Sequence, residues 1–420
     1  MKRKVLGIGF LLVAGTLFAQ APQQHGVGTQ FGGINLSIWK RMSTQPVDTV
    51  GSTWLNVGIY SSMNKLNGLS VNGLASTVKG SASGLQVAGL ACLTAESMNG
   101  VQLSGIANVN GDRMRGISIA GLVNIAGDQC QGITLSGLAS ITGDETHGIS
   151  LGGLLNINGE NAKGLQVGGL ANISGNHASG VGLGGAINVV GDDFNGLQMS
   201  GLLNVTGTEA RGIQLAGAAN VTGESVRGIQ LAGLANVVGS SVRGLQIAPF
   251  NASKRVNGLQ IGLVNYYKET LRGAQIGLVN LSPRTRHQWI ISGGNTSYFD
   301  TGVRFKNQRF YTILGMGTGH RHLGHKFSAS LFYRAGLELP LYRALSVSGD
   351  LGYRHIESFD NKHHGQPARL YALQARLNLH CRLSQKVGLF ATGGYGGSRL
   401  YNHNSTHDKG MIWEAGLLIF

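Results

Sequence analysis

The repeating unit of this chain is clearest in Gly164-Leu165-Gln166-Val167-Gly168-Gly169-Leu170-Ala171-Asn172-Ile173-Ser174-Gly175. Its first glycine recurs every 16 residues from Gly68 to Gly244 without one slip. Gly258 and Gly273 continue the series at intervals of 14 and 15 residues. A register held over so many copies indicates one structural unit stacked on copies of itself, so the chain is a scaffold first.

The repeat has the chemistry of β-strands. Leucine and β-branched residues alternate over short runs, which are interrupted by glycine and by polar turns such as Gly143-Asp144-Glu145-Thr146. Sixteen residues hold two strands of about four residues and two turns, but not a helix and a strand. We therefore predict an all-β protein with a glycine-rich β-solenoid over 64–281, one coil to each repeat.

One asparagine of each unit would lie above its equivalents in such a stack. Each side-chain amide could donate to the carbonyl oxygen of the next, which satisfies a polar group that is costly to bury. We interpret the column as a structural ladder, with a row of ligand-binding amides as the alternative. Its members are Asn108, Asn124, Asn156, Asn172, Asn188, Asn204, Asn220 and Asn236.

Adjacent apolar positions complicate this pattern. Leu170 is followed by Ala171 and then by Ile173, and strict alternation would send the first two to opposite faces of a strand. We expect the leucine to occupy a bend and to face the core. An exposed leucine row would instead be a docking surface.

The chain after residue 281 has a different composition. It holds 18 aromatic residues, against four in 64–280, and 17 Lys and Arg against 7 Asp and Glu. In 327–339, apolar residues occupy the odd positions, while Ser328, Arg334 and Glu338 occupy even ones. One lipid face and one lumen face give this alternation, and about 9–11 residues suffice for a tilted strand to cross a bilayer.

These features predict a small antiparallel outer-membrane β-barrel over 282–420. Two further candidate strands, 33–41 and 53–60, lie in the N-terminal segment 20–63 and would raise the strand number to ten. A larger barrel in which every repeat spans the membrane is the rival architecture, but the repeats lack the aromatic girdles of such strands. The eight predicted strands are 288–294, 299–306, 309–319, 327–342, 345–357, 368–383, 387–401 and 410–420.

Charged residues at the inward positions of these strands would face one another. An eight-stranded barrel is only just wide enough to be filled by its own side chains, so we expect a paired plug. Glu414 is a further candidate for the same cluster. The residues predicted for the barrel interior are Arg334, Glu338, Asp350, Arg354, Arg376 and Arg382.

Loop lengths predict the direction of the barrel. The connections near residues 307, 343 and 385 are short, whereas 319–326, 359–367 and 402–409 are long and polar. Short turns of such barrels face the periplasm, so an even strand number puts the repeats in the periplasm. An error of one strand would put them outside the cell.

Seven histidines fall in the three long connections. Imidazoles could bind zinc or copper if these loops converged, although solvated loop residues explain them equally and no cysteine or carboxylate cluster completes a site. No nucleophile occurs with a base at a telling spacing, so we expect neither an enzyme nor a cofactor. The candidate metal ligands are His320, His322, His325, His363, His364, His403 and His407.

The N-terminus has the features of an export signal. Met1-Lys2-Arg3-Lys4 precedes a short apolar run, so we predict a signal peptide over 1–19. An exported chain without a basic-aromatic motif is not expected to bind nucleic acid, despite its net charge of +15. Lipid or lipopolysaccharide of the outer membrane is the expected counter-charge.

The unit Gly-Leu-Gln-Ile-Gly-Leu-Val-Asn at 258–265, echoed at 273–280, resembles a bacterial family of secreted surface-repeat proteins of unassigned function. The stretch 345–353 is also similar to members of that family. The resemblance implies a location and a repeat type. We expect a non-enzymatic outer-membrane scaffold with a structural or binding role. The alternatives are a surface adhesin, which would bind a protein or a glycan, and a large barrel transporter.

Overall fold

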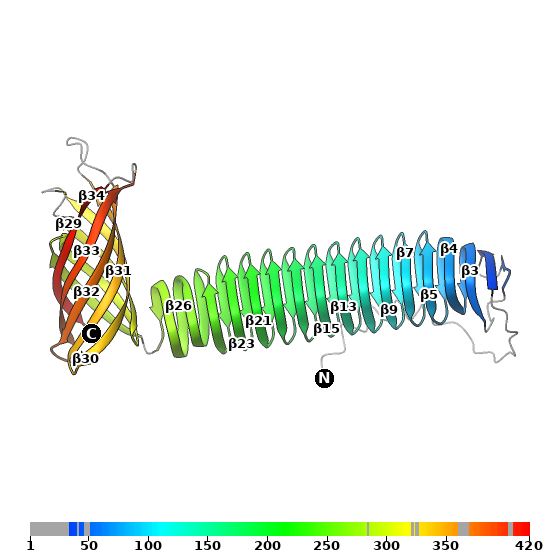
Figure 1. Ribbon diagram of the computed structural model, residues 1–420, viewed down its shortest axis with the longest axis horizontal. Coiled ribbons are helices and arrows are strands. Elements are labelled where there is room, and N and C mark those ends of the chain that lie inside the picture. The colour runs from blue at the N-terminus through cyan, green and yellow to red at the C-terminus, as the bar shows by residue number, and fades with distance from the viewer. Residues whose placement is uncertain are drawn as a thin grey trace. The chain divides into compact units, whose positions relative to one another are not determined.

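The computed structural model describes residues 33–39, 42–45, 51–283, 285–320, 323, 327–359, 369–401 and 406–420. Its regular secondary structure consists of strands, which form a 26-stranded sheet and a separate closed barrel of eight strands (Figure 1). The predicted fold class, a β-solenoid joined to a small antiparallel barrel, is confirmed. The chain divides into two compact units, Met1–Gly233 and Leu234–Phe420.

The solenoid is built from strands that are mostly four, seven or eight residues long. They are β1 Gly33–Trp39, β2 Met42–Ser43, β3 Ser52–Met63, β4 Lys65–Val78, β5 Ala82–Ala88, β6 Ala91–Thr94, β7 Met98–Ser104, β8 Ala107–Asn110, β9 Arg113–Ala120, β10 Val123–Ala126, β11 Gln129–Ser136, β12 Ala139–Thr142, β13 Glu145–Gly152, β14 Leu155–Asn158, β15 Asn161–Gly168, β16 Ala171–Ser174, β17 Ala178–Gly184, β18 Ile187–Val190, β19 Phe194–Ser200, β20 Leu203–Thr206, β21 Glu209–Ala216, β22 Ala219–Thr222, β23 Ser225–Ala232, β24 Ala235–Val238, β25 Ser241–Ile247 and β26 Phe250–Leu281.

Each coil consists of one longer and one shorter strand, as in β15 and β16. Both pair in parallel with the equivalent strands of the preceding coil, so that Gly164 lies beside Gly148 and Asn172 beside Asn156. The register is therefore the 16-residue sequence period. The anchor glycine of the longer strand has a positive φ, which is +118° at Gly164. Glycine adopts this conformation without strain, whereas residues with a Cβ atom do not.

The interior of the solenoid holds both apolar side chains, such as Met98 and Met114, and buried polar ones. In the coil of β15 and β16, Gln166, Asn172 and Ser174 are buried, whereas Leu170 is 49% exposed and Ile173 is 36% exposed. The prediction that the leucine row faces the core is wrong. Leu170 lies in the turn between the two strands, which directs its side chain outward, while amides and small side chains fill the space inside the coil.

The barrel consists of eight strands in antiparallel order, and pairing of its first with its last strand closes it. The two N-terminal candidates, 33–41 and 53–60, do not join it, because β1 and β3 pair in parallel with solenoid strands. The rival in which the repeats form membrane strands is also wrong, since the repeats pair in a separate parallel sheet. The barrel strands are β27 Arg286–Gly294, β28 Ser297–Asn307, β29 Phe310–His320, β30 Ser328–Tyr342, β31 Leu345–Ser358, β32 Arg369–Arg382, β33 Val387–Leu400 and β34 Thr406–Ile419.

The two faces of the barrel wall have opposite polarity. Outward positions carry apolar side chains such as Leu351, which is 71% exposed, and Leu377. Inward positions carry charged side chains such as Arg354, which is 1% exposed, and Arg376. This arrangement inverts the polarity of a water-soluble β-barrel.

Candidate functional site

The predicted asparagine column lies inside the solenoid, and its amides bond along the stack. The Nδ2 atom of Asn156 donates to Oδ1 of Asn172 at 2.8 Å, and Asn172 donates in the same way to Asn188 at 2.9 Å. The series continues through Asn204 to Asn220 at 2.9 Å per step. In the coils before Asn156, the Nδ2 atom of Asn108 donates to Oδ1 of Asn124 at 3.0 Å, and the buried Ser140 occupies the next position.

Sequence reasoning missed two parts of this buried polar system. A second column is made of glutamines, in which Gln214 donates to Gln198 and Gln230 donates to Gln214, both at 2.8 Å. The asparagine column also continues in the second unit, where Asn236 donates to Asn251 at 3.0 Å. Glutamine two residues after the anchor glycine was visible in the repeat, and its recurrence was the available signal.

Removal of one ladder amide is expected to destabilise the solenoid. Asn172→Ala leaves the Asn156 donor and the Asn188 acceptor without this partner, at a cost of about 2–4 kcal/mol. Asn195→Ala is the matched control, because Asn195 is exposed, and its cost should be within about 0.5 kcal/mol of zero. Thermal unfolding followed by circular dichroism measures both. Equal shifts in the two variants would contradict a stabilising role for the ladder.

The two solenoid cysteines are buried in the same interior. Burial raises the pKa of the Cys92 and Cys130 thiols to about 12, so neither forms appreciable thiolate at neutral pH. We expect the folded protein at pH 8 to react with a maleimide at Cys381, which is partly exposed, and at the other two only after denaturation. Mass spectrometry of the labelled protein tests this. Labelling of Cys92 in the folded state would contradict it.

Inside the barrel, Glu414 is the centre of a charged cluster that ties four strands together. Arg334 donates to both of its carboxylate oxygens, at 3.2 Å each. Arg376 also donates to Glu414, and Ser292 Oγ does so at 2.7 Å. These side chains come from β34, β30, β32 and β27, so the cluster joins strands on different sides of the lumen.

Two further ion pairs lie in the same interior. Arg354 forms a bidentate pair with Asp300, and Arg304 donates to Glu338 at 2.6 Å. The Lys306 ammonium lies 2.5 Å from the other oxygen of Glu338. The plug therefore balances cations against carboxylates, as buried charges require.

Neutral donors and aromatic rings complete the plug. Asp350 accepts from the Tyr311 hydroxyl at 2.8 Å and from Asn378 Nδ2 at 2.7 Å. The Arg304 guanidinium lies 3.8 Å from the centre of the Tyr311 ring, and that of Arg334 lies 4.3 Å from the centre of the Phe332 ring. Such contacts rigidify the lumen and leave its charges partnered.

The structure brings together five of the six residues predicted for the interior: Arg334, Glu338, Asp350, Arg354 and Arg376 are all buried. Arg382 is not, because it lies next to the short turn that follows β32, where it is exposed at the mouth. Asp300, Arg304 and Lys306 were missed. The alternation of these charged residues along β28 is the sequence signal that could have found them.

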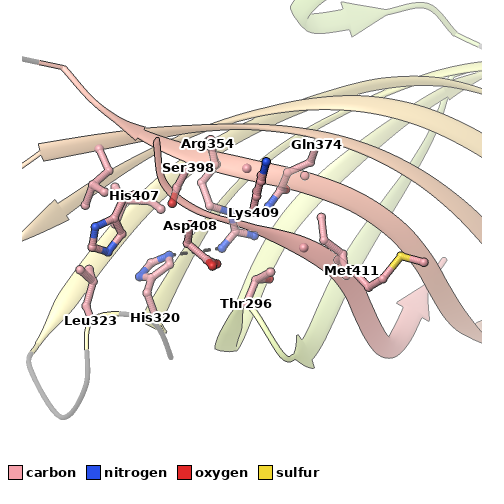
Figure 2. Close-up of a pocket in the computed structure, with 17 residues that line it drawn as sticks. Thr296, His320, Leu323, Arg354, Gln374, Ser398, His407, Asp408, Lys409 and Met411 are labelled. Atoms are coloured by element: carbon pink, nitrogen blue, oxygen red, sulfur yellow. Dashed lines mark hydrogen bonds between the residues drawn. The ribbon is translucent and has the colours of Figure 1, made fainter. Parts of the chain in front are cut away.

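A cavity of about 120 Å³ lies at the mouth of the barrel from which the long connections extend. Figure 2 shows His320, Arg354 and Asp408 among its lining residues. The Nε2 atom of His320 lies 3.4 Å from Nη1 of Arg354, and its Nδ1 atom lies 2.9 Å from Ser328 Oγ. These contacts place His320 at the end of the plug that lies nearest the long connections.

Of the seven predicted metal ligands, two fall among the described residues. His320 is buried and His407 is half-buried, and both line the cavity of Figure 2. His322, His325, His363, His364 and His403 lie outside the described residues. Within the described part of the chain, no group of three or more His, Cys, Asp or Glu side chains is arranged to hold a metal ion.

Comparison with protein-family models, with curated proteins and with solved structures finds no match for this chain. Within the described ranges there is also no helix of sufficient length and hydropathy to cross a membrane.

Proposed function

We propose that this chain is a non-enzymatic outer-membrane protein, in which the barrel anchors the repeat solenoid as a structural element of the cell envelope. One observation carries the proposal: the barrel wall is apolar outside and charged inside. Leu331, Leu351 and Leu377 are each at least 60% exposed, whereas Arg334, Arg354 and Arg376 are buried between them. Water would penalise so many exposed leucines, and a lipid bilayer would not.

The filled lumen supports an anchor and not a channel. The buried cluster around Glu414 crosses the lumen, and an apolar group that includes Ile290, Phe332 and Phe390 packs in the same unit. Side chains fill a barrel of this strand number. A transport role would need an open path past the ion pairs of Arg334 and Arg376 with Glu414.

The connections support a periplasmic solenoid. Strands β28 and β29 are joined by the short turn after Asn307. Arg286, at the start of β27, is the backbone register partner of Lys306, which lies beside that turn. The chain thus enters the barrel at the short-turn mouth, which faces the periplasm in barrels of this type.

Three single cysteines test this proposal, each in a Cys381→Ser background, with the buried Cys92 and Cys130 retained. Thr406→Cys lies at the long-connection mouth, Lys386→Cys at the short-turn mouth and Glu224→Cys on an exposed solenoid turn. Intact cells are treated with a membrane-impermeant maleimide. We expect labelling at 406 alone, and labelling at all three after the outer membrane is permeabilised.

A second candidate, a surface adhesin that binds protein or glycan, is favoured by the exposed apolar row of the solenoid. Its members in the first unit include Leu90, Leu122, Leu154 and Leu202. A continuous apolar row of this kind is typical of an interaction surface. Labelling at 224 and 386 on intact cells would favour the adhesin and overturn the periplasmic arrangement.

A further inference from the structure

The short-turn mouth of the barrel contains a basic cavity that the anchoring role does not use. It has a volume of about 320 Å³ and is lined by residues of β27, β28 and β30 to β34, and of their short turns. Of the described side chains in its wall, five are cationic and one, that of Glu338, is acidic. These cations are Arg304, Lys306, Arg309, Arg343 and Arg382.

Among the described side chains that line this cavity, cationic groups outnumber acidic ones. Glu338 is shared by Arg304 and Lys306. Arg309, Arg343 and Arg382 form no ion pair with any described carboxylate, and two of them lie over aromatic rings at the rim. The Arg343 guanidinium is 5.3 Å from the centre of the Tyr342 ring, and that of Arg382 is 5.3 Å from the centre of the Phe420 ring.

Two buried nitrogen atoms of the lining residues add a second observation. Arg304 is 1% exposed and His380 is 9% exposed, yet Arg304 Nε and His380 Nδ1 have no hydrogen-bond partner among the described residues. The Nε2 atom of His380 lies 2.8 Å from Ser348 Oγ. When Ser348 donates this bond, the imidazole proton lies on Nδ1, which makes His380 a free donor. Buried donors of this kind are costly unless something accepts from them.

The shape and lining favour an anion that carries an organic group. At roughly 30 Å³ per water molecule, the cavity holds about ten, which is more than a lone phosphate fills. Its wall also includes the apolar side chains of Pro340, Leu345 and Leu418. Arginine guanidinium groups recognise phosphate through paired N–H donors. We propose that this cavity binds the phosphate of an organic phosphate, either a soluble sugar phosphate or a phospholipid head group.

Titration calorimetry on the full-length protein in a nonionic detergent tests the proposal. Glucose 1-phosphate represents the soluble source, and nanodiscs containing phosphatidic acid, compared with phosphatidylcholine nanodiscs, represent the lipid source. We expect saturable binding of at least one probe. Arg343→Gln and Arg382→Gln should each weaken it about tenfold, because each removes one charge-assisted contact.

Lys386→Gln is the matched control. Lys386 lies on the turn after β32, and its side chain does not line the cavity. The substitution therefore removes one positive charge from the same mouth of the barrel but not from the cavity wall. The affinity of this variant for the probe should stay within about twofold of that of the parent protein. Absence of saturable binding to either probe, or an equal loss in Lys386→Gln, would overturn the proposal. These outcomes do not depend on where the solenoid lies in the cell, so they are separate from the labelling experiment.

Discussion

Replacing Gly164 by alanine is expected to destabilise the solenoid by at least about 3 kcal/mol, through two independent effects. The residue has a φ of +118°, which is strained for any side chain with a Cβ atom. A Cβ atom there would also lie 2.1 Å from the carbonyl oxygen of Gly148 in the neighbouring coil. The backbone cannot move away without breaking the parallel pairing of β13 and β15, so we expect loss of structure around this coil.

Gly182→Ala is the matched control, because it is the same substitution in the next coil. Gly182 does not have the strained φ, and a Cβ atom would meet nothing closer than 3.8 Å. Its effect should lie between neutral and about 1 kcal/mol stabilising. Thermal unfolding and limited proteolysis, with cleavage sites mapped by mass spectrometry, measure both variants. Similar behaviour of the two would show that stacking of the glycines is not required.

The second large effect is expected in the barrel. Glu414→Gln removes the negative charge that Arg334 and Arg376 share, and both guanidinium groups stay buried. Breaking a buried pair in this way costs about 3–5 kcal/mol, because the remaining cations stay desolvated. The amide keeps the shape of the carboxylate, so packing is preserved and charge is the variable. Folded and unfolded barrels migrate differently on gels, so samples heated to increasing temperatures before electrophoresis give the midpoint temperature of barrel unfolding.

Glu357→Gln is the control for this experiment. Glu357 accepts from Arg369 Nε at 3.3 Å, but both side chains are exposed, so the pair is worth about 0–1 kcal/mol. The expected midpoint of this variant is close to that of the parent protein. A shift in Glu414→Gln no larger than that of the control would show that water reaches the cluster and that the plug is looser than its contacts indicate.

The architecture could be predicted from the sequence, because the period of the sequence pattern equals the register in which the strands pair. The 16-residue interval of Gly148 and Gly164 is the spacing at which coils pair. The alternation in 327–339 is likewise the inward and outward alternation of β30. Both patterns depend on the chain alone. The eight predicted barrel strands therefore lie close to the observed ones.

The polarity of the solenoid could not be predicted in the same way. Periodicity says which residues share a face, but not which face is inside. Leu170 was assigned to the core because apolar residues are usually buried, yet Gln166 and Asn172 are buried inside the coil, where Asn172 bonds to its equivalents in the two neighbouring coils. Hydrogen bonding between coils decides the matter here, and it is a property of the stack.

Long-range partners were also beyond the sequence. Glu414 and Arg334 are separated by 80 residues, and only barrel closure brings them together. Arg382 has the same phase as Arg376 along β32 but lies beyond the wall that covers the others. Phase is local information, whereas depth in the lumen depends on how far each strand extends relative to its neighbours.

The equivalence of the coils has a consequence for how such a chain can change over time. Coils that keep the 16-residue period contact their neighbours at equivalent positions, so a duplicated or deleted block of 16 residues preserves the register of the coils that remain. Each such event alters the stack by one step of about 4.8 Å. The number of repeats therefore works as a ruler, and related chains should differ in reach by whole coils while the plugged barrel stays the same.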